Sequence, residues 1–358
     1  MKPNILHIIN SSGLGGAETI IRDLIRVNKD QVFCLKKDKV ERFSEVSNKI
    51  YFGTKSKFYK FNPLVLLRLV KIIKQKNIQI LHVHLANSLF YAILAKFIYT
   101  KLKIIYHEHG EIFYNKYLNI FLRITQKKVD IFIAVSEATK KALMEKANIP
   151  QKKIVVLYNF VDLDRFNRKN IKINVEKEKA KLGIKKDEFV IGFVGRLAKV
   201  KGCEYLIKAL PYLDFKYKVI IAGDGSEREY LESLAENLNV KDRVIFLGYV
   251  SKPELIYPLF NVLVVPSLSE SFGLSVIEAQ AMGIPVIASD INGLREIISS
   301  KNLFIKGKIR NISKLIKEEK RRTSKYIKSK EIISISKYSL DNYLVKLNNL
   351  YKELLKDD

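Results

Sequence analysis

Cysteine is scarce in this chain, and its two cysteines are not arranged as a site. Among 358 residues only Cys34 and Cys203 are cysteines, and they lie far apart. A disulfide framework or a cysteine-based metal site needs several cysteines at defined spacings, so the sequence excludes both. This usage is typical of a protein in a reducing cytoplasm.

Long uninterrupted apolar runs are also lacking. The first ten residues are too short for a signal peptide, and we expect them to form a first strand. The charge-free stretch 77–95 contains His82, His84, Asn87 and Ser88. We therefore expect a strand followed by a helix there, and not a membrane span.

Acidic residues are absent from the whole segment 46–107, which holds eleven lysines and arginines. The chain as a whole carries a net charge of +27. Such a field attracts polyanions, whether nucleic acid, an anionic lipid surface or a phosphorylated substrate. A general lysine bias explains part of this excess, because the chain is also rich in isoleucine and asparagine. A block of this size without one acid is harder to explain by bias alone.

What the chain does contain is a regular alternation of apolar runs and amphipathic stretches. Its length and its 47% hydrophobic content suffice for two ordinary domains. In the first half we expect strands at 5–9, 31–35, 80–84, 103–106, 131–135 and 154–157, and helices at 17–27, 63–76, 88–99, 116–127 and 137–147. This alternation predicts an α/β domain with a doubly wound parallel sheet.

The second half repeats the pattern after a polar, lysine-rich linker at 167–187. We expect strands at 189–194, 218–222, 244–246, 262–265 and 285–288, and helices at 203–210, 227–238, 253–260, 275–282 and 294–298. The sequence thus predicts two Rossmann-like domains facing a cleft. The polar, basic stretch from 301 leads to a final amphipathic helix at 339–355, which needs a surface to cover. The expected domains are 1–166 with 339–358, and 167–338.

The segment from Glu270 to Glu278 is the most informative motif. A buried-strand run at 262–265 precedes it and an apolar helix start follows Gly273. The loop therefore lies at the carboxyl end of a parallel strand, where open α/β sheets bind ligands. Free N–H groups near Gly273 and Leu274 suit a diphosphate. The two carboxylates can accept hydrogen bonds from different parts of one polyhydroxylated ligand.

Further loops at strand ends carry phosphate-binding chemistry. Arg196 and Lys201, five residues apart, can both reach a diphosphate. Glycines in the strand-end loops at 10–19, 192–196 and 222–226 allow the backbone to approach a phosphate or sugar closely. The loop at 10–19 lacks the glycine spacing of a dinucleotide-binding fingerprint. A tight turn without a ligand remains the alternative for the glycine loops, and two solvated cations remain the alternative for Arg196 and Lys201. The glycines are Gly13, Gly15, Gly16, Gly195, Gly223 and Gly225, and the segment 248–250 follows another strand.

All five histidines lie in the first half of the chain. The pair His107 and His109 has a metal-like spacing, but no cysteine cluster or HExxH arrangement supports zinc. Asp162 and Asp164 resemble a metal-binding DxD motif. At the exit of the first domain we expect them to form a structural Asx turn instead.

These motifs, in this order, resemble the retaining glycosyltransferases of the GT4 type, which have the GT-B fold. The likeness runs over nearly the whole chain. It comprises 13–18, His107 to Gly110, 135–137, Asn159 with Asp162 and Phe166, Gly195-Arg196 with Lys201-Gly202, 223–225, and the E-x7-E signature at 270–278.

The resemblance implies a role for each matching position. Glu278 would bind the ribose of a nucleotide sugar and Glu270 the hydroxyls of the donor sugar. Arg196 and Lys201 would stabilise the leaving diphosphate, and His109 would bind the sugar near its anomeric carbon. Backbone groups would complete the donor site, at Gly15, Gly16, Gly195, Gly223, Gly225, Val250, Phe272, Gly273 and Leu274.

The resemblance also implies a mechanism. Such enzymes usually need no metal, because cations and a helix start stabilise the leaving group. Retention is thought to proceed by front-face attack through an oxocarbenium-like state. Family members return their C-terminal helix to the first domain, and their domains close about a hinge, here expected at 160–166.

The first domain reads the acceptor in this family, and here it holds the acid-free block. Aromatic and cationic residues alternate at 51–61 and 112–123, as in proteins that dock on membranes. We expect a cytoplasmic enzyme, peripheral on the inner membrane face, that extends a lipid-linked glycan for a surface polysaccharide. Packed and solvated helices are the alternative.

Two rival functions remain open from sequence. One is a UDP-sugar 2-epimerase with the same fold, and the other a non-enzymatic polyanion-binding protein. No RNA-binding motif supports a nucleic-acid partner. The donor sugar, the base (UDP expected, GDP open), the acceptor and the oligomeric state are not set by the sequence.

Overall fold

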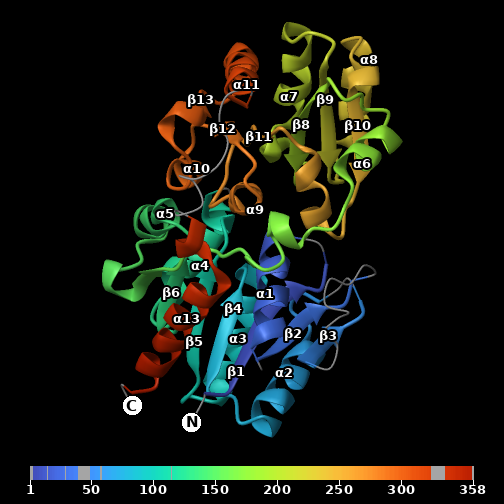
Figure 1. Cartoon of the computed structure of the whole chain (residues 1–358). Helices are drawn as coiled ribbons and strands as arrows, with labels where there is room; N and C mark the ends of the chain where they lie inside the picture. Colours follow the sequence, from blue (N-terminus) through green and yellow to red (C-terminus); the bar gives the residue numbers. More distant parts are fainter. Residues whose placement is uncertain are drawn as a thin grey trace. The chain divides into compact units, whose positions relative to one another are not determined.

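A computed structural model describes residues 3–13, 15–28, 30–38, 49–56, 59–113, 115–323 and 335–356. The chain divides into two compact units (Figure 1). Unit 1 comprises residues 1–159 and 340–358, and unit 2 comprises residues 160–339. Each unit contains one all-parallel sheet, so the expected pair of doubly wound domains is confirmed.

Unit 1 has a seven-stranded sheet in the order β3-β2-β1-β4-β5-β6-β7. Its strands are β1 (Ile5–Ser11), β2 (Gln31–Lys36), β3 (Ile50–Thr54), β4 (Ile80–His84), β5 (Lys103–Glu108), β6 (Ile131–Ala134) and β7 (Ile154–Val156). Its helices are α1 (Gly16–Val27), α2 (Pro63–Gln75), α3 (Ala86–Ile98), α4 (Lys116–Thr125), α5 (Glu137–Ala147) and α13 (Leu340–Leu354). The strand order reverses between β1 and β4, and ligands bind at such switch points.

The two faces of this sheet differ in chemistry. Leu6, Ile8 and Leu81 point to one face, in a core with residues of α2, α3 and α5. The opposite face carries Ile9 beside residues of α1, and the histidines of β1 and β4. The helix α13, red in Figure 1, belongs to this unit and reaches that face through Tyr351. The predicted return of the C-terminal helix to the first domain is therefore confirmed.

Unit 2 has a six-stranded sheet in the order β10-β9-β8-β11-β12-β13. Its strands are β8 (Phe189–Val194), β9 (Tyr217–Ala222), β10 (Val244–Gly248), β11 (Val262–Val265), β12 (Val286–Ser289) and β13 (Leu303–Phe304). Its helices are α6 (Val175–Lys181), α7 (Cys203–Ala209), α8 (Arg228–Asn237), α9 (Leu274–Ala281), α10 (Asn292–Arg295) and α11 (Ile309–Thr323). Here the order reverses between β8 and β11.

Some elements differ from the sequence-based expectation. The edge strand β3 contains Tyr51 and Phe52, which we had assigned to a membrane-docking stretch. The helix expected at 253–260 is wrong, because that segment forms two short 3-10 turns, each with a proline in its first turn. The stretch after 301 is more ordered than expected, since it contains β13 and α11.

The expectation of a strand and helix at 77–95 is confirmed by β4 and α3. In the described parts of the chain, no helix combines the length and apolarity that a membrane crossing needs. From the stretches discussed above, the residues outside the described ranges are 1–2, Leu14, 46–48, Lys57, Phe58, Tyr114, 324–334 and 357–358.

Candidate functional site

Lys201 and Glu270 meet at the switch point of the sheet in unit 2. Lys201 lies in the loop after β8, and Glu270 in the loop after its neighbour β11. The Lys201 Nζ lies 2.5 Å from Oε2 of Glu270, and Ser267 Oγ donates to the same oxygen at 3.3 Å. The side chains are 28% and 14% exposed, so this pair is accessible to a ligand.

Backbone contacts hold these two loops together. The Leu268 N–H donates to the Val200 carbonyl at 2.8 Å. Gly202, between Lys201 and α7, has a φ of +63°. A Cβ atom there would lie 2.1 Å from the Pro266 carbonyl oxygen, so the close approach of the loops requires glycine.

The start of α9 supplies the expected anion-binding geometry. Gly273 adopts a φ of +101° directly before the helix. The first N–H groups of a helix have no intrahelical carbonyl partner, so those of Leu274 and Ser275 can bind an anion, whereas the Val276 N–H donates to the Gly273 carbonyl at 3.0 Å. The Phe272 ring is buried and contacts Tyr338 edge-on at 5.5 Å between centroids, so the ring does not face a ligand.

Glu278 lies in the second turn of α9 and accepts a hydrogen bond from Tyr257. The phenol oxygen is 2.6 Å from Oε2 of Glu278. Burial, followed by the charge of Glu278, raises the pKa of Tyr257 well above its usual value. The hydroxyl therefore stays protonated and orients the carboxylate. Sequence reasoning missed Tyr257, because it lies in an apolar stretch that resembled a core helix.

The glycine loops after β8 and β9 are packed against each other. The Gly195 N–H donates to the Ala222 carbonyl at 3.1 Å, and a Cβ atom on Gly223 would lie 1.8 Å from the Gly195 oxygen. A Cβ atom on Gly225 would lie 2.3 Å from the Leu197 oxygen. These glycines are thus explained by loop packing, whatever else they bind.

Arg196 lies in the loop after β8, and Val250 lies in the loop after β10. Arg196 is exposed, and in the described ranges no carboxylate forms an ion pair with it. Its guanidinium is therefore available for an anionic ligand.

In unit 1 the structure gathers all five histidines on one face of the sheet. His7 on β1 pairs in register with His82 on β4, and His84 on β4 pairs with His107 on β5. Since residues two apart in a strand share a face, His109 continues this row beyond the end of β5. Sequence reasoning noted the H-x-H spacing of His107 and His109 but not this gathering, which depends on the strand order.

Four of the histidines are buried and His109 is partly buried, and they contact one another through their nitrogens. Burial, more than the neighbouring imidazoles, lowers the pKa of His82, His84 and His107 well below the usual value. Burial lowers the pKa of His109 to about 3. All four are therefore neutral at pH 7. Their ligand nitrogens form two groups of three that lie within 4.8 Å of one another, close enough to consider a metal: His7 with His82 and His84, and His84 with His107 and His109.

The loop that carries His109 is fixed by the buried Glu108. One carboxylate oxygen accepts the N–H groups of Gly110 and Ile112, at 2.6 and 3.2 Å. The other accepts the Tyr106 hydroxyl at 2.9 Å. Glu108 thus has a structural role beside His109.

Two further sequence motifs are the glycine pair Gly15-Gly16 and the segment from Asp162 to Asp164. Gly15 is the N-cap residue of α1 and Gly16 its first residue, so both lie at a helix start at the carboxyl end of β1. Asp162 Oδ1 accepts the N–H groups of Asp164 and Arg165, at 3.1 and 3.0 Å. The predicted Asx turn is confirmed.

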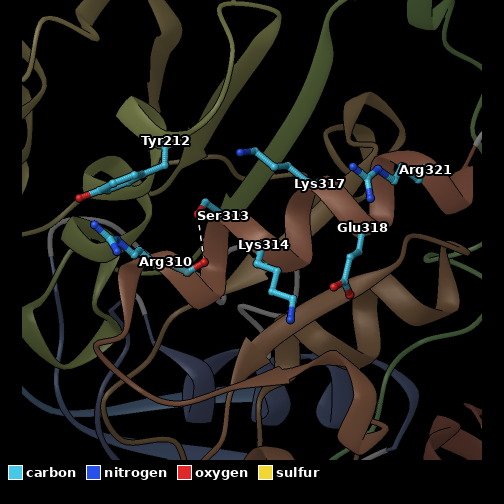
Figure 2. Close-up of a pocket in the computed structure, with 7 residues that line it drawn as sticks. All are labelled: Tyr212, Arg310, Ser313, Lys314, Lys317, Glu318 and Arg321. Atoms are coloured by element: carbon cyan, nitrogen blue, oxygen red, sulfur yellow. Dashed lines mark hydrogen bonds between the residues drawn. The ribbon is translucent and has the colours of Figure 1, made fainter.

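A pocket of about 400 Å³ lies on α11 (Figure 2). Its lining residues belong to other parts of the sequence than the loops described above. Figure 2 shows the Arg310 and Tyr212 side chains at one end and Lys314 and Lys317 along the helix. The pocket contains none of the residues that the sequence indicated. It is basic, and its buried wall residue Ser313 donates its hydroxyl to the Arg310 carbonyl at 3.0 Å and not to a ligand.

Comparisons with known proteins agree over both units. Residues 174–331 match the family model of glycosyl transferases group 1, and residues 14–165 match that of glycosyltransferase family 4. An uncharacterized glycosyltransferase of Methanocaldococcus jannaschii is 39% identical over 46% of this chain and 44% of its own length, so that match spans less than half of the relative. An uncharacterized 41.2 kDa protein from the cps region of Klebsiella pneumoniae is 31% identical over 83% of each chain.

Solved structures share the fold over the full length. The Anabaena protein HepE, crystallised with UDP and glucose, superposes with a TM-score of 0.85 at 21% identity, covering 99% of each chain. At this identity the likeness concerns the fold alone. The expected GT-B fold class is thereby confirmed.

Proposed function

Since the chain belongs to the GT4-type, group 1 glycosyltransferases, we propose that it transfers a hexose-type sugar from a nucleotide diphosphate sugar to a glycan. The donor we propose is a UDP-sugar, in keeping with the UDP held by the Anabaena relative. The observation that carries the proposal is the Lys201–Glu270 pair at the switch point of unit 2. An ammonium and a carboxylate side by side suit a ligand with both phosphates and hydroxyls.

We propose that Lys201 and Arg196 stabilise the diphosphate as it leaves. Departure of the sugar leaves negative charge on the phosphate oxygens, and preorganised cations lower the energy of that transition state. The backbone at Phe272, Gly273 and Leu274 adds N–H groups to the same task. When a diphosphate binds, Lys201 is expected to exchange its contact with Glu270 for the phosphate, which releases the carboxylate to the sugar hydroxyls.

Glu278 is the proposed ribose ligand. A ribose has two neighbouring hydroxyl donors, and the carboxylate that Tyr257 orients can accept from both. The backbone around Gly195, Gly223, Gly225 and Val250 is proposed to contact the rest of the nucleotide. From unit 1 we propose Gly15 and Gly16 as diphosphate contacts and His109 as a sugar contact. No metal enters this scheme.

The reaction proposed is retaining, with the leaving phosphate accepting the proton of the acceptor hydroxyl. The bond from the anomeric carbon to the phosphate oxygen breaks, and the bond to the acceptor oxygen forms on the same face. The relative encoded in a cps region supports a role in surface polysaccharide synthesis.

A donor panel tests this function. The protein is incubated with UDP- and GDP-sugars, and hydrolysis, thermal shift and the anomeric configuration of any product are measured. We expect one UDP-hexose to be hydrolysed slowly and to raise the melting temperature. Accumulation of a 2-epimer of UDP-N-acetylglucosamine without acceptor would contradict transfer and favour an epimerase.

We further propose that unit 1 docks on an anionic membrane, where a lipid-linked acceptor resides. Helix α4 buries Leu118 and Leu122, yet it exposes Tyr117, Ile120 and Ile124 to 88%, 56% and 74%. Residues spaced by three and four share one face of a helix, so these three form an apolar stripe facing solvent. A protein without a partner for such a stripe gains by inserting it among lipid headgroups.

Basic residues accompany the exposed apolar groups. Lys116 and Arg123 are exposed on α4, and α2 exposes Leu64 and Leu67 in the acid-free block. Each cation near an anionic surface contributes about 1 kcal/mol. Full burial of one isoleucine contributes roughly 1.5–3 kcal/mol.

Vesicle co-sedimentation tests the docking surface. Replacing both Ile120 and Ile124 with serine is expected to weaken binding to anionic vesicles by about tenfold or more. Replacing Lys314 and Lys317 of α11 with alanine removes two cations from unit 2 and serves as the control. Equal binding of wild type to neutral and anionic vesicles would refute the electrostatic part of the proposal.

A further inference from the structure

Glu278, the proposed ribose ligand, is supported by side chains that lie outside the donor loops. Its partner Tyr257 belongs to the second of the two 3-10 turns, Tyr257–Leu259, which precede β11. The Tyr257 hydroxyl is 2.6 Å from Oε2 of Glu278 and 3.3 Å from the Ser275 carbonyl oxygen. Both contacts are with α9, so a shift of this turn would move or release the Glu278 carboxylate.

Arg165 holds the first of these 3-10 turns, Pro253–Leu255. Its Nε and Nη2 atoms both donate to Oε2 of Glu254, at 3.0 and 2.8 Å. The two side chains are only 14% and 13% exposed. A sheltered ion pair with two charge-assisted hydrogen bonds is stronger than a solvated surface pair, so it can fix the turn that leads to Tyr257.

Arg165 also reaches Tyr257 through the ring of Phe166. The Arg165 guanidinium lies over the Phe166 ring, 5.1 Å from its centroid. The Phe166 and Tyr257 rings meet edge to face, at 5.9 Å between centroids. Burial and the charge of Glu278 raise the pKa of Tyr257, whereas the charge of Arg165 lowers it. Arg165 therefore acts on Tyr257 by two routes, through Glu254 and through Phe166.

The backbone of Arg165 is held in turn by Asp162, which is 8% exposed. The Oδ1 atom of Asp162 accepts the Arg165 N–H at 3.0 Å, and its carbonyl oxygen accepts the Phe166 N–H at 2.8 Å. The Asx turn at Asp162 thus places the two side chains that reach Tyr257.

We propose that Arg165 is a positioning residue for donor binding: with Glu254 and Phe166 it holds Tyr257 where its hydroxyl presents the Glu278 carboxylate to the ribose. This role rests on the proposed function, since it takes the ligand of Glu278 to be the ribose of a nucleotide donor. The ribose contact is the same before and during sugar transfer. Loss of Arg165 should therefore raise the donor KM and leave kcat nearly unchanged.

Calorimetric titration of the whole protein with two nucleotides tests the proposal. UDP has both ribose hydroxyls, and 2′,3′-dideoxy-UDP has neither. We expect the wild type to bind UDP about tenfold or more tightly than the dideoxy nucleotide, because the hydrogen bonds to the carboxylate are lost with the hydroxyls. Arg165→Met should bind UDP about five- to tenfold more weakly than the wild type does, and should bind the dideoxy nucleotide equally well.

The chain offers a matched control in Lys218, which pairs with Glu188 in unit 2 at 3.6 Å, with side chains 17% and 8% exposed. Lys218→Ala should lose about as much stability as Arg165→Met but keep the wild-type affinity for both nucleotides. Arg165→Met combined with Glu254→Gln removes the carboxylate that would be left unpaired, and its UDP affinity should stay low.

If Arg165→Met does not fold, Arg165→Lys takes its place. Lysine keeps the positive charge but lacks the planar, two-pronged donor, so UDP binding should weaken about threefold and binding of the dideoxy nucleotide should not change. Wild-type affinity for UDP in the Arg165 variants would overturn the positioning role. An equal loss of affinity for both nucleotides would overturn it too, and so would a loss of kcat with an unchanged donor KM.

Failure of the proposed function gives a different result. A wild type that binds both nucleotides with equal affinity would refute ribose binding by Glu278 and, with it, the role of Arg165. A wild type that distinguishes the two nucleotides, together with an Arg165→Met variant that distinguishes them equally well, would refute the role of Arg165 alone.

Discussion

Replacement of Lys201 with alanine separates the catalytic role of its charge from any role in folding. In the account above, Lys201 neutralises the diphosphate as the sugar departs. Removing one preorganised donor of this kind lowers kcat by about 10²–10³, or roughly 3–4 kcal/mol of transition-state stabilisation. We therefore expect Lys201→Ala to retain less than about 1% of transfer.

The same substitution should cost little stability. The Lys201–Glu270 pair is 28% and 14% exposed, so solvent screens part of its attraction. Partly exposed ion pairs contribute about 0–1 kcal/mol. For two domains of this size that corresponds to a melting-temperature change of no more than about 4 °C. The large effect on rate and the small effect on folding distinguish this site from a structural ion pair.

The chain offers a matched control in Lys208. Its ammonium also lies 2.5 Å from a carboxylate, that of Glu204, and the pair is 32% and 17% exposed on α7. Release of UDP is measured at saturating acceptor across a range of donor concentrations, with thermal unfolding in parallel. Lys208→Ala should melt like Lys201→Ala but keep nearly full turnover.

Two results would contradict the catalytic role assigned to Lys201. Turnover of Lys201→Ala within threefold of the wild type would remove Lys201 from the catalytic set. An equal loss in Lys208→Ala would show that the assay reports stability. The double variant Lys201→Ala with Glu270→Gln excludes a third explanation, because it removes the carboxylate left without its partner. Its turnover should stay as low as that of Lys201→Ala.

Further predictions concern the other site residues and the histidines. Glu278→Ala should abolish most transfer with the fold intact, and Tyr257→Phe should raise the donor KM about fivefold, since one orienting hydrogen bond is lost; an unchanged donor KM in both would contradict ribose binding. Glu270→Gln should lower the rate of transfer less than Lys201→Ala does, because one acceptor oxygen remains in the glutamine side chain; a complete loss of transfer would show that the negative charge of Glu270 is needed. Gly293→Ala should reduce transfer, because a Cβ atom there would lie 2.2 Å from the Glu270 carbonyl oxygen; wild-type kinetics would show that the loop adapts freely. The pKa values of four histidines lie below the ordinary value in the folded chain, so the unfolded chain binds more protons. Stability in urea should thus be full above pH 6.5 and fall below it, by about 1.4 kcal/mol per pH unit for each histidine; a flat profile from pH 7 to 5 would contradict their burial.

The alternation of apolar runs and amphipathic stretches in the sequence predicted most of the strands and helices. The elements that were predicted wrongly or missed have local causes. The expected helix at 253–260 contains Pro253 and Pro258, each of which removes a backbone donor, so the segment forms 3-10 turns. The strand β3 is a short sheet edge with half-buried side chains, which weakens its apolar signal. The helix α11 was missed because its surface is densely charged, although Ile312 and Ile316 are buried.

The candidate site was predictable where its residues share one loop. Glu270 and Gly273 were read from a single strand–loop–helix segment. The contact of Lys201 with Glu270 joins residues 69 apart and needed the strand order of unit 2. The gathering of the five histidines on one sheet face needed the register of β1, β4 and β5, which no local pattern encodes.

Calorimetric titration with UDP shows whether unit 2 binds a nucleotide diphosphate at the β8–β11 switch point, and it needs neither the acceptor nor the correct sugar. We expect the wild type and Lys208→Ala to bind UDP equally, and Glu278→Ala and Lys201→Ala each to bind it at least tenfold more weakly. Equal UDP affinity in all four proteins would contradict a nucleotide diphosphate site at the β8–β11 switch point.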